Sequence, residues 1–288
     1  MRGSSKAVQV KVAGLRGGHP GLEIDKGRAN AIKIMGRVLT ALSQTGARLA
    51  FIEGGNKHNA IPRECESRLL VPVQGMDAAE KIVNDVNNTV RSEFAAVEPG
   101  LLISLAATKP GKKASALKKS EQQKILQTIS ALPHGVIKMS ADIPGLVETS
   151  TNLAVIRTVR NSVKIATSQR SSVSSELEEI AATVSSVLEL GGASVENTDA
   201  YPGWKPNMNS SILNVAKSAH SELFGKEPEV KAIHAGLECG IIGERIPGMD
   251  MVSLGPTLEG VHSPDEKIYI DTVERFWIFL LEILKNVD

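Results

Sequence analysis

The chain has 288 residues, with 33 Lys and Arg against 32 Asp and Glu, 42% hydrophobic residues, 3% aromatic residues and two cysteines. This composition is typical of a globular protein of one or two domains. The balanced charge and scarce aromatic residues exclude the basic, stacking surface that binds nucleic acid. The amino terminus has no apolar signal segment, and the stretch 276–284 is too short to span a bilayer, so we expect a cytoplasmic protein without a membrane segment. Cys65 and Cys239 lie far apart, which excludes a disulfide framework and predicts two small buried hydrophobic side chains.

The first third of the chain alternates the patterns of strands and helices. The predicted elements are, in chain order, a strand at 8–15, a helix at 26–43, strands at 48–53 and 65–73, a helix at 77–97 and a strand at 101–107. The order β-α-β-β-α-β predicts a ferredoxin-like sheet with its helices on one face, within the α/β class.

The middle of the chain opens with a lysine-rich segment, 108–120, which is either a solvated connection or a basic patch for a partner. It is followed by a predicted helix at 121–132, strands at 134–140, 152–159 and 162–168, and a helix at 172–190. Gly191 and Gly192 provide the stop of that helix.

The last third has a different texture, rich in Pro and Gly. The predicted elements are a helix at 210–224, a strand at 229–233, a loop-rich stretch at 236–248, a strand at 249–255, a polar loop at 255–266 and a helix at 269–287. Two strands are fewer than the five or six that a sheet has on average, so this region predicts only part of an α/β layer.

Three residues in the first two thirds are candidates for binding a ligand. His19 follows a strand in the loop GLRGGHPG, where it presents a hydrogen-bond donor, is simply solvated, or accompanies an anion nest made by the glycines. Asn59 in GGNKHNAIPRE binds a carboxylate or peptide group, or forms a turn. Arg170 lies between a strand and a helix, where it clamps a carboxylate bidentately or is an ordinary surface arginine.

The last third contains possible metal ligands. His234 and Glu238 are four residues apart in HAGLECG, and His262 lies in a loop before the last helix. Histidine and glutamate are zinc ligands by type, but the spacing is not that of H-E-x-x-H. A mononuclear metal site made by these three residues therefore stays open.

Six motifs, in this order, resemble those of one enzyme family. They are GLRGGHPG, GGNKHNAIPRE, AYPGWKPN, IHAGLECG, MDMVSLGP and GVHSPDE. The family is that of the aminoacyl-histidine (Xaa-His) dipeptidases, also called cytosol non-specific dipeptidases, which are di-zinc metallopeptidases. The resemblance implies a residual strand at 1–13, a ferredoxin-like lid and dimerisation domain at 14–192, and the carboxyl-terminal portion of an α/β zinc-peptidase catalytic domain at 193–288.

The resemblance also implies roles for individual residues. His262 matches a zinc ligand, and His19 matches the lid histidine that stabilises the oxyanion of the tetrahedral intermediate. Asn59 and Arg170 match lid residues that hold a dipeptide, with Arg170 on its free carboxylate. Glu238 lies in a loop that lines the substrate pocket and is a candidate for contacting the amino end of the dipeptide.

The sequence departs from the family where the remaining zinc ligands are expected. None of the six histidines stands in an H-x-D pair, and the adjacent glutamates that include the general base are absent. In addition, Pro20 stands where the family has a small Ser, and His58 where it has Arg. A hydrolytic zinc site needs about three protein ligands and a base, so for this chain alone we expect at most one weak zinc site and negligible hydrolysis.

Two functions therefore remain open. One is a cytoplasmic zinc dipeptidase that acts with a complementing amino-terminal half. The other is a non-catalytic module that dimerises or binds a partner through the lid.

Overall fold

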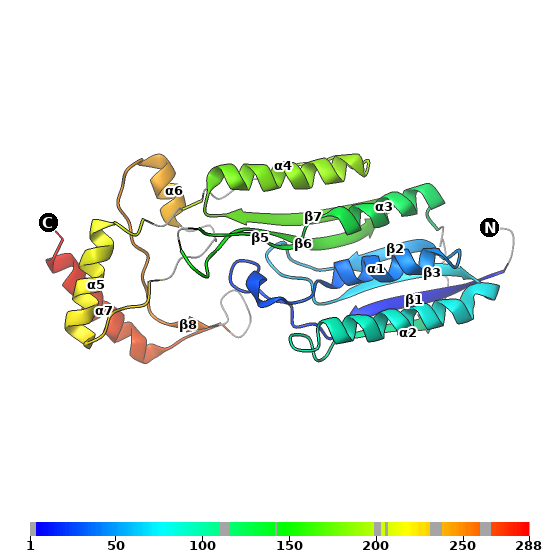
Figure 1. The fold of residues 1–288 in the computed structure, drawn as a ribbon, viewed down its shortest axis with the longest axis horizontal. Helices are drawn as coiled ribbons and strands as arrows, with labels where there is room; N and C mark the ends of the chain where they lie inside the picture. The colour runs from blue at the N-terminus through cyan, green and yellow to red at the C-terminus, as the bar shows by residue number, and fades with distance from the viewer. Residues whose placement is uncertain are drawn as a thin grey trace. The chain divides into compact units, whose positions relative to one another are not determined.

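The structure is a computed structural model that describes residues 4–109, 116–141, 143–198, 203–204, 207–230, 238–259 and 266–287. The chain divides into two compact units, 1–199 with 233–235, and 200–232 with 236–288 (Figure 1). Each unit has a hydrophobic cluster of its own. Over the described ranges, no helix has both the length and the apolar character needed to cross a membrane.

The first unit begins with the predicted ferredoxin-like arrangement. Its elements are β1 (Ser5–Ala13), α1 (Ala31–Ser43), β2 (Arg48–Gly54), β3 (Cys65–Pro72), α2 (Met76–Glu93) and β4 (Leu102–Ala107). The four strands pair antiparallel in the spatial order β4-β1-β3-β2, which is the order that β-α-β-β-α-β chains form. The predicted ferredoxin-like sheet is therefore confirmed.

A second set of elements extends this sheet to seven strands. They are α3 (Lys119–Ala131), β5 (Gly135–Met139), β6 (Val147–Val159), β7 (Ser162–Ser171) and α4 (Ser174–Leu190). Strand β6 joins the ferredoxin-like part through Glu53 and Gly54 of β2, pairs with β7 along its length, and pairs with β5 near its start. This extension brings β6 and β7 beside the loops that leave β1 and β2.

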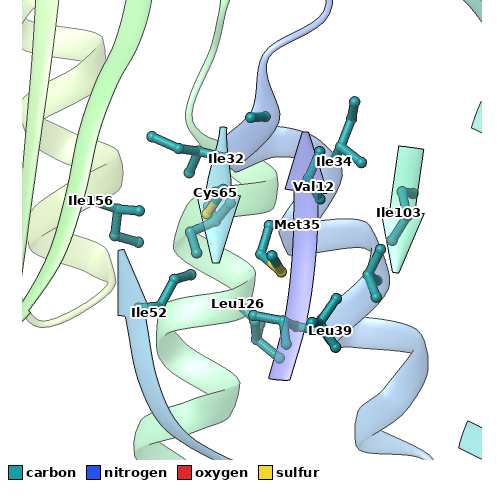
Figure 2. Close-up of a cluster of buried hydrophobic side chains, with 14 of the residues drawn as sticks. Val12, Ile32, Ile34, Met35, Leu39, Ile52, Cys65, Ile103, Leu126 and Ile156 are labelled. Carbon is teal, nitrogen blue, oxygen red and sulfur yellow. The ribbon is translucent and has the colours of Figure 1, made fainter. Parts of the chain in front are cut away.

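The core lies between one face of the sheet and the helices. In β1 the side chains of Val8, Val10 and Val12 are fully buried, whereas Gln9 and Lys11 between them are polar. Figure 2 shows side chains of α1, among them Met35 and Leu39, gathered with those of the strands. The predicted burial is confirmed for Cys65, where it raises the pKa of the thiol, whereas Cys239 is only half-buried.

Helix α1 begins later than its apolar spacing predicted. Residues Ile24–Lys26 form a separate 3₁₀ turn that ends at Gly27, whose φ is 66°. Asn30 is extended and caps the helix, because its Oδ1 accepts from the N–H groups of Ile32 and Lys33 at 2.9 and 3.2 Å. The predicted helix at 26–43 was therefore wrong at its start, because a cap decides where a helix begins.

The second unit contains α5 (Ser211–Phe224), α6 (Glu238–Arg245), β8 (Leu258–Glu259), β9 (Lys267–Ile268) and α7 (Ile270–Lys285). Helices α5 and α7 pack through Ala216, Ala219 and Ile283.

Three predictions for the second unit differ from the structure. The segment 249–255 is not a strand, and neither is 229–230, the described part of the strand predicted at 229–233. The stretch 236–248, predicted as loop, contains α6. An apolar segment becomes a strand only where a neighbouring strand supplies hydrogen-bond partners, and the described part of this unit offers only the two-residue pairing of β8 with β9.

Candidate functional site

Three segments that are distant in sequence meet at one edge of the first unit. The loop after β1 pairs with the loop after β2 through an isolated bridge, in which the N–H of Ile61 donates to the carbonyl oxygen of Gly18 at 2.8 Å. Ile24, Ile61 and Val147, the first residue of β6, form a small hydrophobic cluster. The bridge and the cluster together place the loops of His19 and Asn59 beside the start of β6.

The imidazole of His19 has a defined tautomer. The N–H of Gly21 donates to Nδ1 of His19 at 3.1 Å, and the N–H of His19 itself donates to Oε2 of Glu23 at 2.9 Å. A ring nitrogen that accepts a hydrogen bond carries no proton, so the neutral ring carries its proton on Nε2. The half-buried His19 is thereby a hydrogen-bond donor through Nε2.

Arg170 lies inside β7, one residue from its end, rather than after the strand as predicted. Its Nε atom is buried and, among the described residues, has no hydrogen-bond partner. Burial lowers the pKa of the guanidinium, which nevertheless remains a cation because the pKa of arginine starts far above neutral. A buried N–H donor without an acceptor is unfavourable until an anionic ligand supplies one.

Gly21 is the point at which His19 and Arg170 meet. A Cβ atom on Gly21 would lie 2.9 Å from Cε1 of His19 and 3.1 Å from Nη1 of Arg170. The two side chains, which the sequence separates widely, are therefore neighbours across a residue that has no side chain. Asn59 belongs to the adjoining loop, two residues before the bridged Ile61, and is half-buried.

Asn152 of β6 is a further polar residue of this region that the sequence analysis missed. Its side chain is fully buried, its Nδ2 donates to the carbonyl oxygen of Ala60 at 2.9 Å, and its Oδ1 has no partner among the described residues. The strand register pairs Ser150 with Arg170 and Asn152 with Ser168, so Asn152 and Arg170 occupy neighbouring positions on one face. The signal in the sequence is weak, because Asn152 follows the polar run Glu148–Thr151 of the same strand, and its burial shows only in the fold.

The remaining predicted site residues belong to the last third of the chain. His234 and His262 lie outside the described residues, and Glu238 is the exposed first residue of α6. Within the ranges that the structure describes, no three His, Cys, Asp or Glu side chains gather as metal ligands. The described residues therefore contain no set that fits a zinc ion, and the metal roles of His262 and of the His234, Glu238 and His262 trio stay predictions.

The chain is similar to known peptidases in both sequence and fold. Residues 5–98 match the family of the peptidase dimerisation domain. Over 283 residues, 98% of this chain, the sequence is 37% identical to the cytosol non-specific dipeptidase of Escherichia coli (strain K12), and the match covers 58% of that protein. The fold matches the crystal structure of aminoacylhistidine dipeptidase from Vibrio alginolyticus with a TM-score of 0.90 and 36% identity, over 100% of this chain and 59% of that one.

These matches confirm the resemblance carried by the sequence motifs. Over nearly its whole length the chain is similar to the aminoacyl-histidine and cytosol non-specific dipeptidases, and its first part matches the peptidase dimerisation domain. It spans less than two thirds of the length of these relatives, at 58% and 59%.

Proposed function

We propose that this chain holds the substrate of a dipeptidase in its first unit. Arg170 binds the free carboxylate of a dipeptide, and His19 donates from Nε2 to the carbonyl oxygen of its peptide bond. The observation that carries the proposal is the approach of both side chains to Gly21, together with the buried Nε of Arg170 that lacks an acceptor among the described residues. The dipeptidase activity named for the two relatives supports it.

The spacing of the two groups favours a short ligand. In a dipeptide the peptide carbonyl and the free carboxylate are one residue apart, and one residue of extended chain spans at most about 3.6 Å. His19 and Arg170 both reach within 3.1 Å of a single point at Gly21. A tripeptide held at its first peptide bond would carry its carboxylate one residue further from His19, so we expect it to bind more weakly.

The hydrogen bond from His19 would act mainly during the reaction. The carbonyl oxygen gains negative charge in a tetrahedral intermediate. A donor that is already oriented therefore stabilises the intermediate more than it stabilises the bound substrate. In this proposal Asn59 binds the dipeptide beside Arg170 from the adjoining loop.

Hydrolysis needs more than these residues. In the family, zinc ions activate the attacking water, and we propose His262 as one zinc ligand. No metal set occurs among the described residues, and the sequence lacks an H-x-D pair. We therefore propose that residues 1–288 alone hold at most one weak zinc site and do not hydrolyse dipeptides, and that turnover needs a complementing amino-terminal half.

Elemental analysis of the purified chain, with hydrolysis of Gly-His assayed on the same sample, tests this part of the proposal. Little zinc and no turnover are expected. About two zinc ions per chain with turnover would show that other residues replace the missing ligands.

Homodimerisation through the first unit is a second proposed function, which the match of residues 5–98 to the peptidase dimerisation domain supports. Light scattering coupled to gel filtration should give twice the chain mass of 30.7 kDa. A monomer at all concentrations would contradict homodimerisation.

A cytoplasmic location is also part of the proposal, and the name of the Escherichia coli relative supports it.

Calorimetric titration with Gly-His tests substrate binding directly. We expect the dipeptide to bind, and its carboxyl-terminal amide to bind roughly tenfold or more weakly, because the amide removes the partner of Arg170. Arg170→Met should weaken the binding of the dipeptide by a similar factor. Arg37→Met, which breaks an exposed ion pair with Glu93, should leave the affinity for the dipeptide unchanged. Equal binding of dipeptide and amide would refute the assignment of Arg170.

A further inference from the structure

We propose that Glu23 and Arg28 are positioning residues for His19. Their ion pair holds the backbone of the loop 17–19 and thereby fixes the direction in which the imidazole presents its Nε2 proton. This inference rests on the proposed function in one respect, the role of His19 as a donor to the dipeptide.

The ion pair grips the loop from both sides of Gly18. Nη2 of Arg28 lies 2.6 Å from Oε1 of Glu23, and Nη1 of Arg28 donates to the carbonyl oxygen of Gly17. The other carboxylate oxygen of Glu23 accepts the N–H of His19 at 2.9 Å. One charged pair therefore binds the peptide group before Gly18 and the peptide group after it.

The pair lies directly against Gly18. A Cβ atom on this glycine would lie 2.5 Å from Nη1 of Arg28 and 2.6 Å from Oε2 of Glu23. Gly17 and Gly18 have φ angles of 67° and 148°, a conformation that glycine adopts readily but leaves readily as well. Two such residues in succession need outside contacts to hold one conformation, and the ion pair supplies them.

Further hydrogen bonds connect the held backbone to the ring of His19. The carbonyl oxygen of His19 accepts from the N–H groups of Leu22 and Glu23 at 3.1 and 2.9 Å, which closes a tight turn. Within this turn the N–H of Gly21 reaches Nδ1 of the ring. The turn is anchored at His19 by Glu23, so a loss of Glu23 or Arg28 releases the hydrogen bond that selects the tautomer.

The surroundings of the pair suit a positioning role. The side chains of Arg28 and Glu23 are 20% and 32% exposed, less than those of the surface pair Arg37 and Glu93 at 46% and 41%. Less exposure and the additional backbone partners strengthen a charged pair. Both side chains are partly exposed and bind the backbone of the loop 17–19, so their loss should alter the loop more than the fold.

Nitrogen NMR of the full chain with ¹⁵N-labelled histidine tests the inference. The ring signals of His19 are identified by their loss in His19→Gln. In the unaltered chain we expect a single neutral tautomer protonated at Nε2. In Glu23→Ala and Arg28→Ala we expect a mixture of tautomers and Gly-His binding weakened roughly tenfold.

Matched variants separate positioning from a general effect on the fold. Glu93→Ala breaks the exposed Arg37–Glu93 pair of the same unit and should leave the His19 ring signals unchanged. The double variant Glu23→Ala/Arg28→Ala should weaken binding no more than either single variant, because the two residues act as one unit. Should Glu23→Ala fail to fold, Glu23→Gln keeps an oxygen acceptor for the N–H of His19, loses the charge for Arg28, and should still shift the ring signals.

Unchanged His19 ring signals in the folded variants of both Glu23 and Arg28 would overturn the proposal. The ring signals also test the positioning role of Glu23 and Arg28 when the unaltered chain binds no Gly-His. In that case the proposed function fails, whereas the effect of Glu23 and Arg28 on the tautomer is still measured.

Discussion

The imidazole of His19 and the guanidinium of Arg170 approach each other across Gly21, whose missing side chain leaves both in place. A Cβ atom there would lie 2.9 Å from Cε1 of His19 and 3.1 Å from Nη1 of Arg170. The loop after β1 supplies one group and β7 supplies the other, so the relationship exists only in the folded sheet.

Replacing Gly21 tests this relationship. Gly21 is not among the glycines with positive φ, so an alanine fits its backbone, but the new methyl group would collide with His19 and Arg170. We expect Gly21→Ala to fold and to bind Gly-His roughly tenfold or more weakly by calorimetry. Gly255→Ala is the matched control, because nothing lies within 4 Å of its Cβ position and its φ is ordinary. Equal affinity of the two variants would contradict the neighbourhood of His19 and Arg170.

Asn152 is expected to support the loop that carries Asn59. Asn152→Ala removes the donor to the carbonyl oxygen of Ala60, and should lower the free energy of unfolding by about 1–3 kcal/mol as well as weaken Gly-His binding. Urea denaturation and calorimetry measure the two effects. Asn84→Ala, at an exposed position of α2, should change neither. Retention of both properties in Asn152→Ala would show that the loop holds its place without this amide.

The lowered pKa of His134 predicts that the protein loses stability in mild acid. Burial first, and the neighbouring cation of Lys33 second, lower the pKa of His134 from 6.5 to about 4. The unfolded chain then binds a proton that the folded chain excludes, so stability is complete above pH 6.5 and falls as the pH drops towards 4. The loss from this one group amounts to about 3 kcal/mol at most.

Urea denaturation of the unaltered chain and of His134→Gln at several pH values between 6.5 and 4 checks this contribution. The free energy of unfolding should fall more steeply in the unaltered chain than in the variant. Parallel profiles would assign the acid sensitivity to other groups.

The apolar packing of α1 against the sheet should dominate the stability of the first unit. Leu39 is 1% exposed, so Leu39→Ala leaves a cavity and should lower the free energy of unfolding by about 2–5 kcal/mol. Leu190, at the end of α4, is 89% exposed, and Leu190→Ala should change the free energy of unfolding by less than about 0.5 kcal/mol. Similar losses for both variants in urea would mean that the core is not where the structure has it.

Local patterns predicted most of the first unit. Val8, Val10 and Val12 alternate with polar residues, and this period of two can be read without knowing what the strand pairs with. The order of the elements then limited the sheet to the ferredoxin-like arrangement. His19, Asn59 and Arg170 were recognised through motifs, because spacing alone left each with an ordinary structural interpretation.

The same reasoning failed where a segment depends on a distant partner. The apolar segment 249–255 has the composition of a strand, but the structure shows no strand there. The start of α1 was missed for a similar reason, since the cap formed by Asn30 depends on a side-chain rotation that apolar spacing does not encode.

The sequence by itself determined most strands and helices of the first unit, the resemblance to the dipeptidases, and the identity of the candidate ligand-binding residues. Only the tertiary structure decided that His19 and Arg170 meet at Gly21, that Asn152 is buried beside the loop of Asn59, and that Glu23 and Arg28 grip the backbone before His19. Secondary structure follows from interactions between residues a few positions apart, which periodicity records. A binding site follows from contacts between distant segments, and those exist only after the sheet has brought the segments together.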